Sequence, residues 1–366
     1  MLRRSTYLEN RLVMADSGVV TLDVNVRDPI TSLFFEFRAT NGATSNIANH
    51  VAQNVLSVDL IDGSEVLMSL TGQQLAALTW YHRGYIPNTL MCEGPGAVQN
   101  MVAEMQFGRW HGDTVYAFDP ARFKNPQIRV TWNLATVNPI GATGFVTASG
   151  LLTVIADVME GAPSPQGMLT AIQHYQFVTP AAGNTYIDLP VDKRLKAVML
   201  RSFLAATGGV AGVSNVKLSA DQDKFIPLDV SKVDLQRYLS MKNPPFVYKT
   251  DFRASDGMTI FMALKNEDNV QLQPNWPQAT TSYINAGIGE GLYNQQTNDI
   301  ADGNLRSPMA IVSGFIPYSA ALIDLGEWDD PSTWLDATAF KSLRLILTHN
   351  VAAAACSVVL EQEKLY

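Results

Sequence analysis

Two stretches of this 366-residue chain decide its fold: DPARFKNPQIRVTWN (119–133) and DATAFKSLRLILTHN (336–350). They align without a gap, and five aligned positions carry the same residue in both. The identical pairs are Asp119 and Asp336, Phe123 and Phe340, Lys124 and Lys341, Thr131 and Thr348, and Asn133 and Asn350. Ile128 and Val130 also match Leu345 and Leu347, as one buried face of a strand requires. The match predicts that the same strand occurs near the end of each half of the chain.

Two further blocks match in the same order along the chain. VTLDVNVRDPITSLFFEFRAT (20–40) corresponds to TYIDLPVDKRLKAVMLRSFLAAT (185–207), with an apolar-Asp-apolar start, a charged turn and a long apolar strand. SVDLIDGSEVLMSLTGQQLAAL (57–78) corresponds to NVKLSADQDKFIPLDVSKVDLQRY (215–238), with two strands around an Asp-containing turn and then a short helix. Three matched blocks in one order indicate an internal duplication.

Most of the chain alternates apolar and polar residues over short runs, as in VTLDVNV (20–26) and IRVTWNL (128–134), which predicts β-strands. Helical periodicity is brief, at residues 71–84 and 231–242, and each of these segments opens with a Thr or Ser that can cap a helix. Many short strands joined by Gly and Pro turns are typical of β-sandwiches and barrels.

The segment EGAPSPQG (160–167) separates the halves, because its two prolines and two glycines suit a linker. We therefore expect an N-terminal arm over 1–18, a first sandwich over 19–161, a linker over 162–167 and a second sandwich over 168–366. Residues 266–308 are rich in Asn, Gln, Gly and Pro, which predicts a long surface loop that is mobile or clasps a neighbouring subunit.

Charged residues make up only 16% of the chain, below the ~25% of typical soluble domains. Burial of the surface against neighbouring subunits explains such a composition, and a polar surface of Asn, Gln, Ser and Thr is the alternative. The net charge of −8 argues against a protein that wraps nucleic acid. The one basic cluster, Arg3, Arg4 and Arg11, could contact a membrane surface or phosphates, or form a solvated end.

Cys92 and Cys356 form neither a disulfide framework nor a zinc pattern, which fits assembly in a reducing cytoplasm. No signal peptide is visible in the first thirty residues. The longest uncharged stretch, 130–156, is interrupted by Asn, Pro and Gly, so we expect two strands there rather than a membrane helix, and a soluble protein.

The hairpin SVDLIDGSEVLMSLTGQQL, its short helix and their repetition in a second half resemble the double jelly-roll major capsid proteins. These occur in tailless, membrane-containing icosahedral viruses of bacteria and archaea and in their eukaryotic relatives. The likeness covers about residues 19–161 and 168–366. It implies an all-β fold of two tandem eight-stranded jelly-roll sandwiches with short helices in loops.

The resemblance also implies a function and partners. The chain would be a structural protein of the virion, assembled in the host cytoplasm, whose homotrimers have a pseudo-hexagonal outline and tile an icosahedral shell. Its partners would be itself, neighbouring capsomers, penton or minor capsid proteins and an internal viral membrane near the N-terminal arm. No sequence-specific binding of nucleic acid is expected. Four of the identical pairs are structural repeat positions: Asp119, Phe123, Lys124 and Asn133 with Asp336, Phe340, Lys341 and Asn350.

Catalytic and metal-binding patterns are absent from the sequence, so we expect no enzyme activity, metal or cofactor. The histidines are scattered without ligand spacing, at His50, His82, His111, His174 and His349. The acid pairs Asp329–Asp330 and Asp221–Asp223 read as turn formers, and 299–304 reads as an Asp-Gly turn rather than a calcium loop. Trp80 and Trp132 are expected in cores, and Trp276 is the one tryptophan expected to be an exposed contact.

Two other functions stay open. One is a carbohydrate- or receptor-binding β-sandwich protein, and the other is a two-jelly-roll amidase or glycosidase. The second would need two carboxylates across a cleft, for which Asp329, Asp330 and Asp113, with His111, are the candidates.

Overall fold

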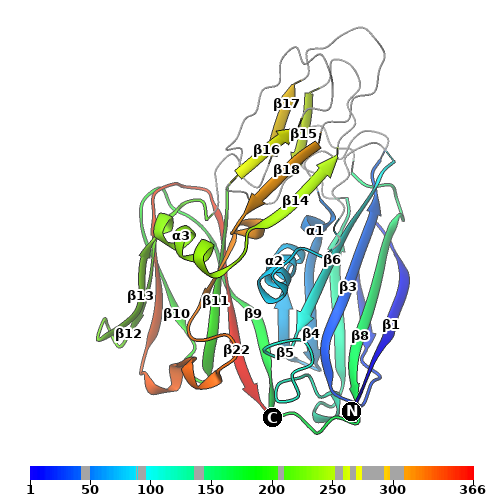
Figure 1. Cartoon of the computed structure of the whole chain (residues 1–366), viewed down its shortest axis with the longest axis horizontal. Helices are drawn as coiled ribbons and strands as arrows, with labels where there is room; N and C mark the ends of the chain where they lie inside the picture. The colour runs from blue at the N-terminus through cyan, green and yellow to red at the C-terminus, as the bar shows by residue number, and fades with distance from the viewer. Residues whose placement is uncertain are drawn as a thin grey trace.

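The computed structural model describes residues 1–42, 50–87, 89, 96–135, 144–204, 210–251, 259–263, 269–273, 292–296 and 309–366. Two β-sandwiches stand side by side, with a group of shorter strands projecting beyond one end of them (Figure 1). No helix among the described residues is both long and apolar enough to span a membrane.

The first sandwich is formed by the first eight strands. One sheet has the order β1 (Leu2–Met14), β8 (Gly150–Glu160), β3 (Ile30–Thr40) and β6 (Val98–Gln106). The facing strands are β2 (Ser17–Asp23), β7 (Pro126–Asn133), β4 (Val55–Asp62) and β5 (Glu65–Leu70). All these neighbours are antiparallel, and the chain crosses between the sheets in the order of a jelly roll.

The second sandwich repeats this order. One set of strands runs β9 (Gly167–Val178), β22 (Ala355–Leu365), β11 (Arg194–Phe203) and β19 (Ala320–Asp324), with the short β20 (Leu335–Asp336) also on β11. The other runs β10 (Gly183–Leu189), β21 (Leu343–His349), β12 (Val213–Ala220) and β13 (Phe225–Ser231). The predicted all-β fold of two eight-stranded jelly rolls is confirmed.

The two stretches that revealed the duplication form β7 and β21 at equivalent positions. Ile128 and Val130 are buried in the first core, and Leu345 and Leu347 are buried in the second. In the first sandwich Ile128 is paired with Leu22 and Leu60, and in the second Leu345 is paired with Ile187 and Leu218. The two halves therefore share one register as well as one strand order.

The conserved spacing of the repeat positions has a local cause. Asp119 and Asp336 each cap a 3-10 turn, η1 (Pro120–Arg122) and η4 (Ala337–Ala339), and Phe123 and Phe340 end these turns. The next backbone N–H groups, of Lys124 and Lys341, donate to the carboxylates of Asp62 and Asp221. Asp62 is the last residue of β4, and Asp221 directly follows β12. One carboxylate at the end of the neighbouring strand thus fixes the entry into β7 or β21.

The last repeat pair is less alike. The side chain of Asn133 accepts a hydrogen bond from the N–H of Ala135, whereas the backbone N–H of Asn350 donates to Gly212 O. The neighbouring residues Trp132 and His349 are both buried at one position of the duplicated strand.

Short helices lie in the loops, as predicted. They are α1 (Val51–Asn54), α2 (Gly72–Arg83), α3 (Lys232–Lys242) and the 3-10 turns η2 (Pro317–Ser319) and η3 (Pro331–Thr333). Thr71 and Gln74 form a capping box at the start of α2, and Gly84 ends this helix in a left-handed conformation (φ 73°) that favours glycine. Ser231 caps α3 through the N–H of Asp234.

The N-terminal residues do not form the expected arm. Leu2–Met14 is the edge strand β1, paired with β8 from Leu2↔Glu160 to Met14↔Gly150. Residues 1–18 thus contribute a full strand to the first sandwich.

The expected loop 266–308 also differs from a plain loop. Its described parts are strands β16 (Asn269–Gln273) and β17 (Leu292–Gln296), and its other residues lie outside the described part of the chain. β16 pairs with β18 (Met309–Gly314), which also pairs with β14 (Phe246–Asp251), and β17 pairs with β15 (Thr259–Ala263). These five strands are the projecting group in Figure 1.

Candidate functional site

The interface between the sandwiches, here called the seam, is the region where buried polar chemistry gathers. β5 and β9 pair in parallel at Ser69↔Ile172 and so join a sheet of each sandwich. β11 is buried on both faces: Val198 and Leu200 lie in the second core, while Ala197 and Met199 pack in the cluster that contains α2. The apolar residues of β11 thus pack on both sandwiches at once and hold them together.

Three ionisable side chains are buried inside the seam. Lys196 Nζ lies 2.9 Å from Glu361 Oε1, and His82 Nε2 of α2 lies 3.2 Å from the same oxygen. All three side chains are at most 3% exposed. Lys196 Nζ also lies 3.2 Å from the centre of the Trp328 ring, a cation–π contact.

The electrostatics of this triad favour an ionised carboxylate. Burial alone would raise the pKa of Glu361, but the neighbouring Lys196 and His82 outweigh it and lower that pKa to about 2. Burial lowers the pKa of Lys196, and Glu361 opposes that shift. Because His82 comes from the first sandwich and the other two from the second, the triad ties the halves together.

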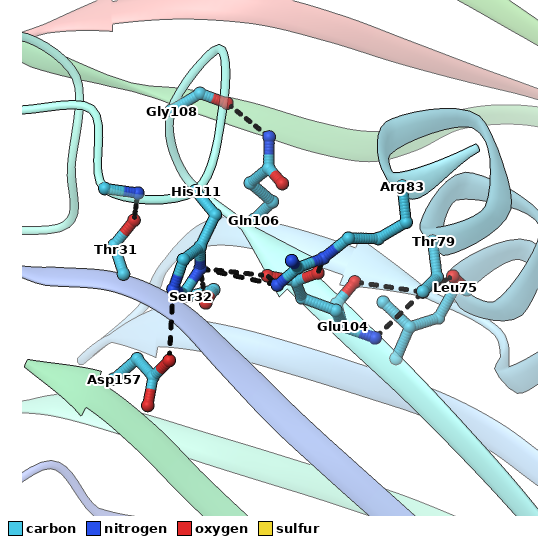
Figure 2. Close-up of polar contacts among 11 residues, drawn as sticks. Thr31, Ser32, Leu75, Thr79, Arg83, Glu104, Gln106, Gly108, His111 and Asp157 are labelled. Atoms are coloured by element: carbon cyan, nitrogen blue, oxygen red, sulfur yellow. Dashed lines mark hydrogen bonds and ion pairs between the residues drawn. The ribbon is translucent and has the colours of Figure 1, made fainter. Parts of the chain in front are cut away.

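A second cluster lies on the outer face of the β1-β8-β3-β6 sheet (Figure 2). His111 stands between two acids, with Nε2 3.3 Å from Asp157 and Nδ1 3.7 Å from Glu104. Arg83 at the end of α2 donates two hydrogen bonds to Glu104, one of them 2.8 Å long. Burial would raise the pKa of Glu104, but the hydrogen bonds from His111 and Arg83 outweigh it and lower the pKa to about 2. The cluster fastens α2 and the loop after β6 to the sheet.

Two of the three acids named as catalytic candidates, Asp113 and Asp330, make structural contacts through their carboxylates. Asp113 is almost fully buried, and Arg109 binds both of its oxygens. Arg109 also donates to the backbone O of Asp329, so these residues do meet between the sandwiches. The Asp329 side chain is exposed, however, and Asp330 caps η3. His111 belongs to the Figure 2 cluster.

The remaining candidates also have structural roles. His50 caps α1, His174 Nε2 lies 2.9 Å from Asp188 O, and His349 lies between Gly212 O and Thr185. Asp221 accepts from the start of β21, and Asp223 pairs with Lys217. Cys356 is buried, its thiol donates to Ser202 Oγ, and burial raises its pKa.

Of the remaining residues singled out in the sequence, some lie in the described part of the chain and others do not. Trp80 and Trp132 are buried, as predicted. Cys92, Trp276 and residues 299–304 lie outside the described residues. Within the described ranges, no group of three or more His, Cys, Asp or Glu side chains is arranged to hold a metal ion.

A half-open cavity of about 130 Å³ lies at the seam beside the start of α2. Glutamine side chains from both sandwiches line it, among them Gln73, Gln74 and Gln173, together with Arg201. Arg201 donates to Gln73, and Gln74 donates to Gln173 and to Ser357. The cavity is smaller than the ~300–1,000 Å³ of typical ligand sites, and its polar groups bind one another.

Sequence reasoning did not find Lys196, Glu361, Arg83 or Glu104. A signal did exist for two of them, because Lys196 and Glu104 are single charges inside apolar strand sequences, LKAVML and MVAEMQF. Their partners are far away in the sequence, so no motif spacing could reveal the pairs.

Two jelly rolls in tandem, joined along a buried seam, make a double jelly-roll fold. The fold is similar over the whole chain to the crystal structure of the STIV MCP, with a TM-score of 0.63 and 11% identity, covering 100% of this chain and 97% of that one. It is likewise similar to the major capsid protein P2 from bacteriophage PM2, with a TM-score of 0.57, 13% identity and coverage of 100% and 98%. For PBCV-1 VP54 the TM-score is 0.57, the identity 12% and the coverage 99% and 93%.

The predicted resemblance to double jelly-roll major capsid proteins is therefore confirmed at the level of the fold. No protein-family model and no curated protein sequence matches the chain.

Proposed function

We propose that this chain is the major capsid protein of a tailless icosahedral virus, and that its homotrimers tile the shell as pseudo-hexagonal units. The carrying observation is the two-way coverage: the chain spans nearly all of each similar capsid protein and has nearly nothing outside them. A protein that used jelly rolls for catalysis or glycan binding would need a pocket with convergent polar groups, and the cavity at the seam, about 130 Å³, is smaller than typical ligand sites.

The physical properties of the chain support a building block. A trimer of two similar sandwiches presents six similar units around one axis. The apolar seam and its buried triad hold the two units of each chain at one angle, which a tiling subunit needs. The small share of charged residues, 16%, suits a surface that is largely covered on assembly.

We further propose that the partners are neighbouring capsomers and penton or minor capsid proteins, in a shell assembled in the host cytoplasm. The net charge of −8 argues against binding of nucleic acid. Because residues 1–18 contain strand β1, we do not assign them a contact with a viral membrane.

Mass photometry of the purified chain tests this proposal. We expect a species of about 120 kDa, three times the 40.0 kDa of one chain, and shell-like or hexagonally packed assemblies in electron micrographs at high concentration. A stable monomer at micromolar concentration, with binding to a glycan array or release of sugar or ammonia from glycopeptides, would favour the alternatives.

A further inference from the structure

The internal duplication leaves two edges without the partner that their counterparts have. In the first sandwich, strand β5 is covered because it pairs with β9 of the second. The counterpart of β5 is β13, and the counterpart of β9 is β1. Both β13 and β1 end their sheets, with no neighbour on their outer side among the described strands. Unpaired edges of this kind are templates for pairing with another strand.

The helices beside these strands, α2 and α3, also differ in how far their side chains are covered. α2 and α3 follow equivalent strands, begin with equivalent N-caps and both contact the two preceding strands, β4 and β5 or β12 and β13. α2 packs in addition on β6. Aligned from their caps, Leu78 corresponds to Tyr238, and His82 corresponds to Lys242. Leu78 is 1% exposed in the seam, whereas Tyr238 is 43% exposed.

Apolar side chains concentrate at this edge of the second sandwich. Those of β13 and α3 with large exposed areas are Phe225, Ile226, Val233, Tyr238 and Met241. The counterpart of Met241, which is 86% exposed, is Tyr81, whose hydroxyl donates across the seam to Phe315 O and Ala320 O. Phe225 and Ile226 correspond to Glu65 and Val66, which are exposed in the first sandwich as well. The contrast with the twin therefore lies in α3, where Tyr238 and Met241 stand at covered positions of α2, and it indicates a surface that a partner covers.

We infer that β13 and α3 dock onto β1 and the outer face of the β1-β8-β3-β6 sheet of a second copy of this chain. The contact would repeat between chains the seam that exists within each chain. This inference rests on the proposed self-assembly and names its surface.

The register of the two halves fixes which residues would meet. β3 and β11 carry the same bulge against β8 and β22, after Ile30↔Val158 and after Leu195↔Gln362. Beyond the bulge, Asp157 therefore corresponds to Glu361. These two acids lie opposite Ser5 of β1 and Ala171 of β9, so Thr6 corresponds to Ile172.

The opposite side of the contact follows from the hairpins. Ser69 lies opposite Asp59, and Asp229 lies opposite Lys217 at the equivalent place, so Asp229 corresponds to Ser69. The pairing Ser69↔Ile172 within the chain then becomes Asp229↔Thr6 between chains.

The residues that would meet between chains are chemically complementary, although they differ from the corresponding residues of the seam within the chain. Within the chain, His82 approaches Glu361; between chains, Lys242 would approach Asp157. Each already has a partner within its chain, Lys242 in Asp324 at 3.4 Å and Asp157 in His111 at 3.3 Å. Their side chains are nevertheless 37% and 21% exposed, so each can take a second partner across the contact. Within the chain, Gln74 donates to Gln173; between chains, the counterpart Tyr7 can donate its hydroxyl to Asp234.

This contact is head-to-tail, because each chain presents one β13–α3 edge and one β1 edge. Heterologous contacts close into rings when the rotation at each step allows it. A closed ring would alternate seams within chains and seams between chains.

Cysteine cross-linking tests the register directly. A Thr6→Cys chain mixed with an Asp229→Cys chain should form covalent dimers under oxidising conditions, because paired residues in adjacent strands lie within disulfide range. Neither variant alone should do so, which also controls for the native cysteines. The Thr6→Cys/Asp229→Cys double variant should give larger covalent oligomers ending in a closed ring.

The matched control is Tyr186→Cys, an exposed position on β10 at the opposite edge of the same four strands as β13. Mixed with Thr6→Cys it should not cross-link. Oligomers in mass photometry without the Thr6–Asp229 cross-link, or equal cross-linking of the control pair, would overturn the inference and leave the proposed function standing. Monomers at every concentration would overturn both.

A charge reversal provides a second measurement. Lys242→Glu should raise the dissociation constant of the oligomer at least about tenfold, because it places like charges together at Asp157. Lys193→Glu, the same change in the β10–β11 turn, should leave the constant unchanged. Equal effects of the two variants would contradict the contact.

Discussion

Replacing Glu361 with Gln removes the charge at the centre of the seam and changes the shape of the side chain little. Lys196 then remains 1% exposed without its carboxylate, held only by the Trp328 ring and by the more distant Asp324. Removing one partner of a buried pair typically destabilises a protein by about 3–5 kcal/mol, because the remaining charge is not compensated.

The expected shift in melting temperature follows from the length of the chain. Unfolding entropy is about 2.1 cal/mol/K per residue, so 366 residues that unfold together give about 0.8 kcal/mol/K. Glu361→Gln should then lower Tm by about 4–7 °C, and by more if the sandwiches unfold separately. We expect one cooperative transition to split into two, since the triad joins the halves.

Differential scanning calorimetry of three variants measures this effect. Asp188→Asn is the matched control, because it removes one carboxylate charge from an exposed ion pair. Asp188 pairs with Arg344 at 2.7 Å, and both side chains are at least half exposed, so loss of this pair should cost less than about 1 kcal/mol. The double variant Lys196→Met/Glu361→Gln should recover much of the loss, because no uncompensated charge is left. A Glu361→Gln protein that melts like the Asp188→Asn control would refute the reasoning.

Three other predictions use the duplication and the pKa shifts. Asp62→Ala and Asp221→Ala should each destabilise the chain by about 0.5–1.5 kcal/mol in urea unfolding, because each removes two hydrogen bonds from backbone N–H groups that water can then solvate; a loss at only one site would show that the turns are not equivalent. Glu104 and Glu361 have pKa values of about 2 in the folded chain against 4.5 as the ordinary value, so their stabilisation should be complete above pH 4.5 and decline as the pH falls towards 2. Urea midpoints measured from pH 7 to 3 should fall less steeply in the Glu104→Gln/Glu361→Gln variant than in the wild type. Deleting residues 278–300 should leave both sandwiches folded by circular dichroism while changing oligomer stability or the outer surface, and complete loss of soluble protein would contradict the expectation of a peripheral segment.

The fold could be predicted from sequence because duplication makes weak local patterns visible twice. The strands β7 and β21, the pairs β2–β3 and β10–β11, and the hairpins followed by α2 and α3 all occupy the positions that the matched blocks predicted. Strand β1 was missed because its pattern is broken: the register against β8 shifts between Tyr7 and Glu9 and again between Glu9 and Leu12. Two such shifts remove the period-2 alternation by which a strand is recognised.

The polar chemistry of the seam was not predictable for a different reason. Lys196 and Glu361 lie 165 residues apart and meet His82 only because the second sandwich packs on α2 of the first. Pairing of this kind is set by tertiary packing, and a single charge in an apolar strand says only that a partner must exist. For the acid candidates, closeness in the sequence was misleading. Asp329 and Asp330 are adjacent, but both lie in an exposed turn, where Asp330 caps η3.

The divergence between α2 and α3 has a physical explanation if the second seam forms between chains. α2 is covered as soon as its own chain folds, so it can carry Ala76, Ala77 and Leu78 on its covered side without exposing them to water. α3 must remain soluble in a free subunit, and it accordingly has Arg237 and Lys242 among its exposed apolar residues. Charges that keep a monomer in solution also supply the complementary pairs that select the correct partner edge. α2 and α3 occupy equivalent positions in the two sandwiches. α2 carries apolar residues because its contact forms as the chain folds, and α3 carries both charged and apolar residues because its contact forms only after folding.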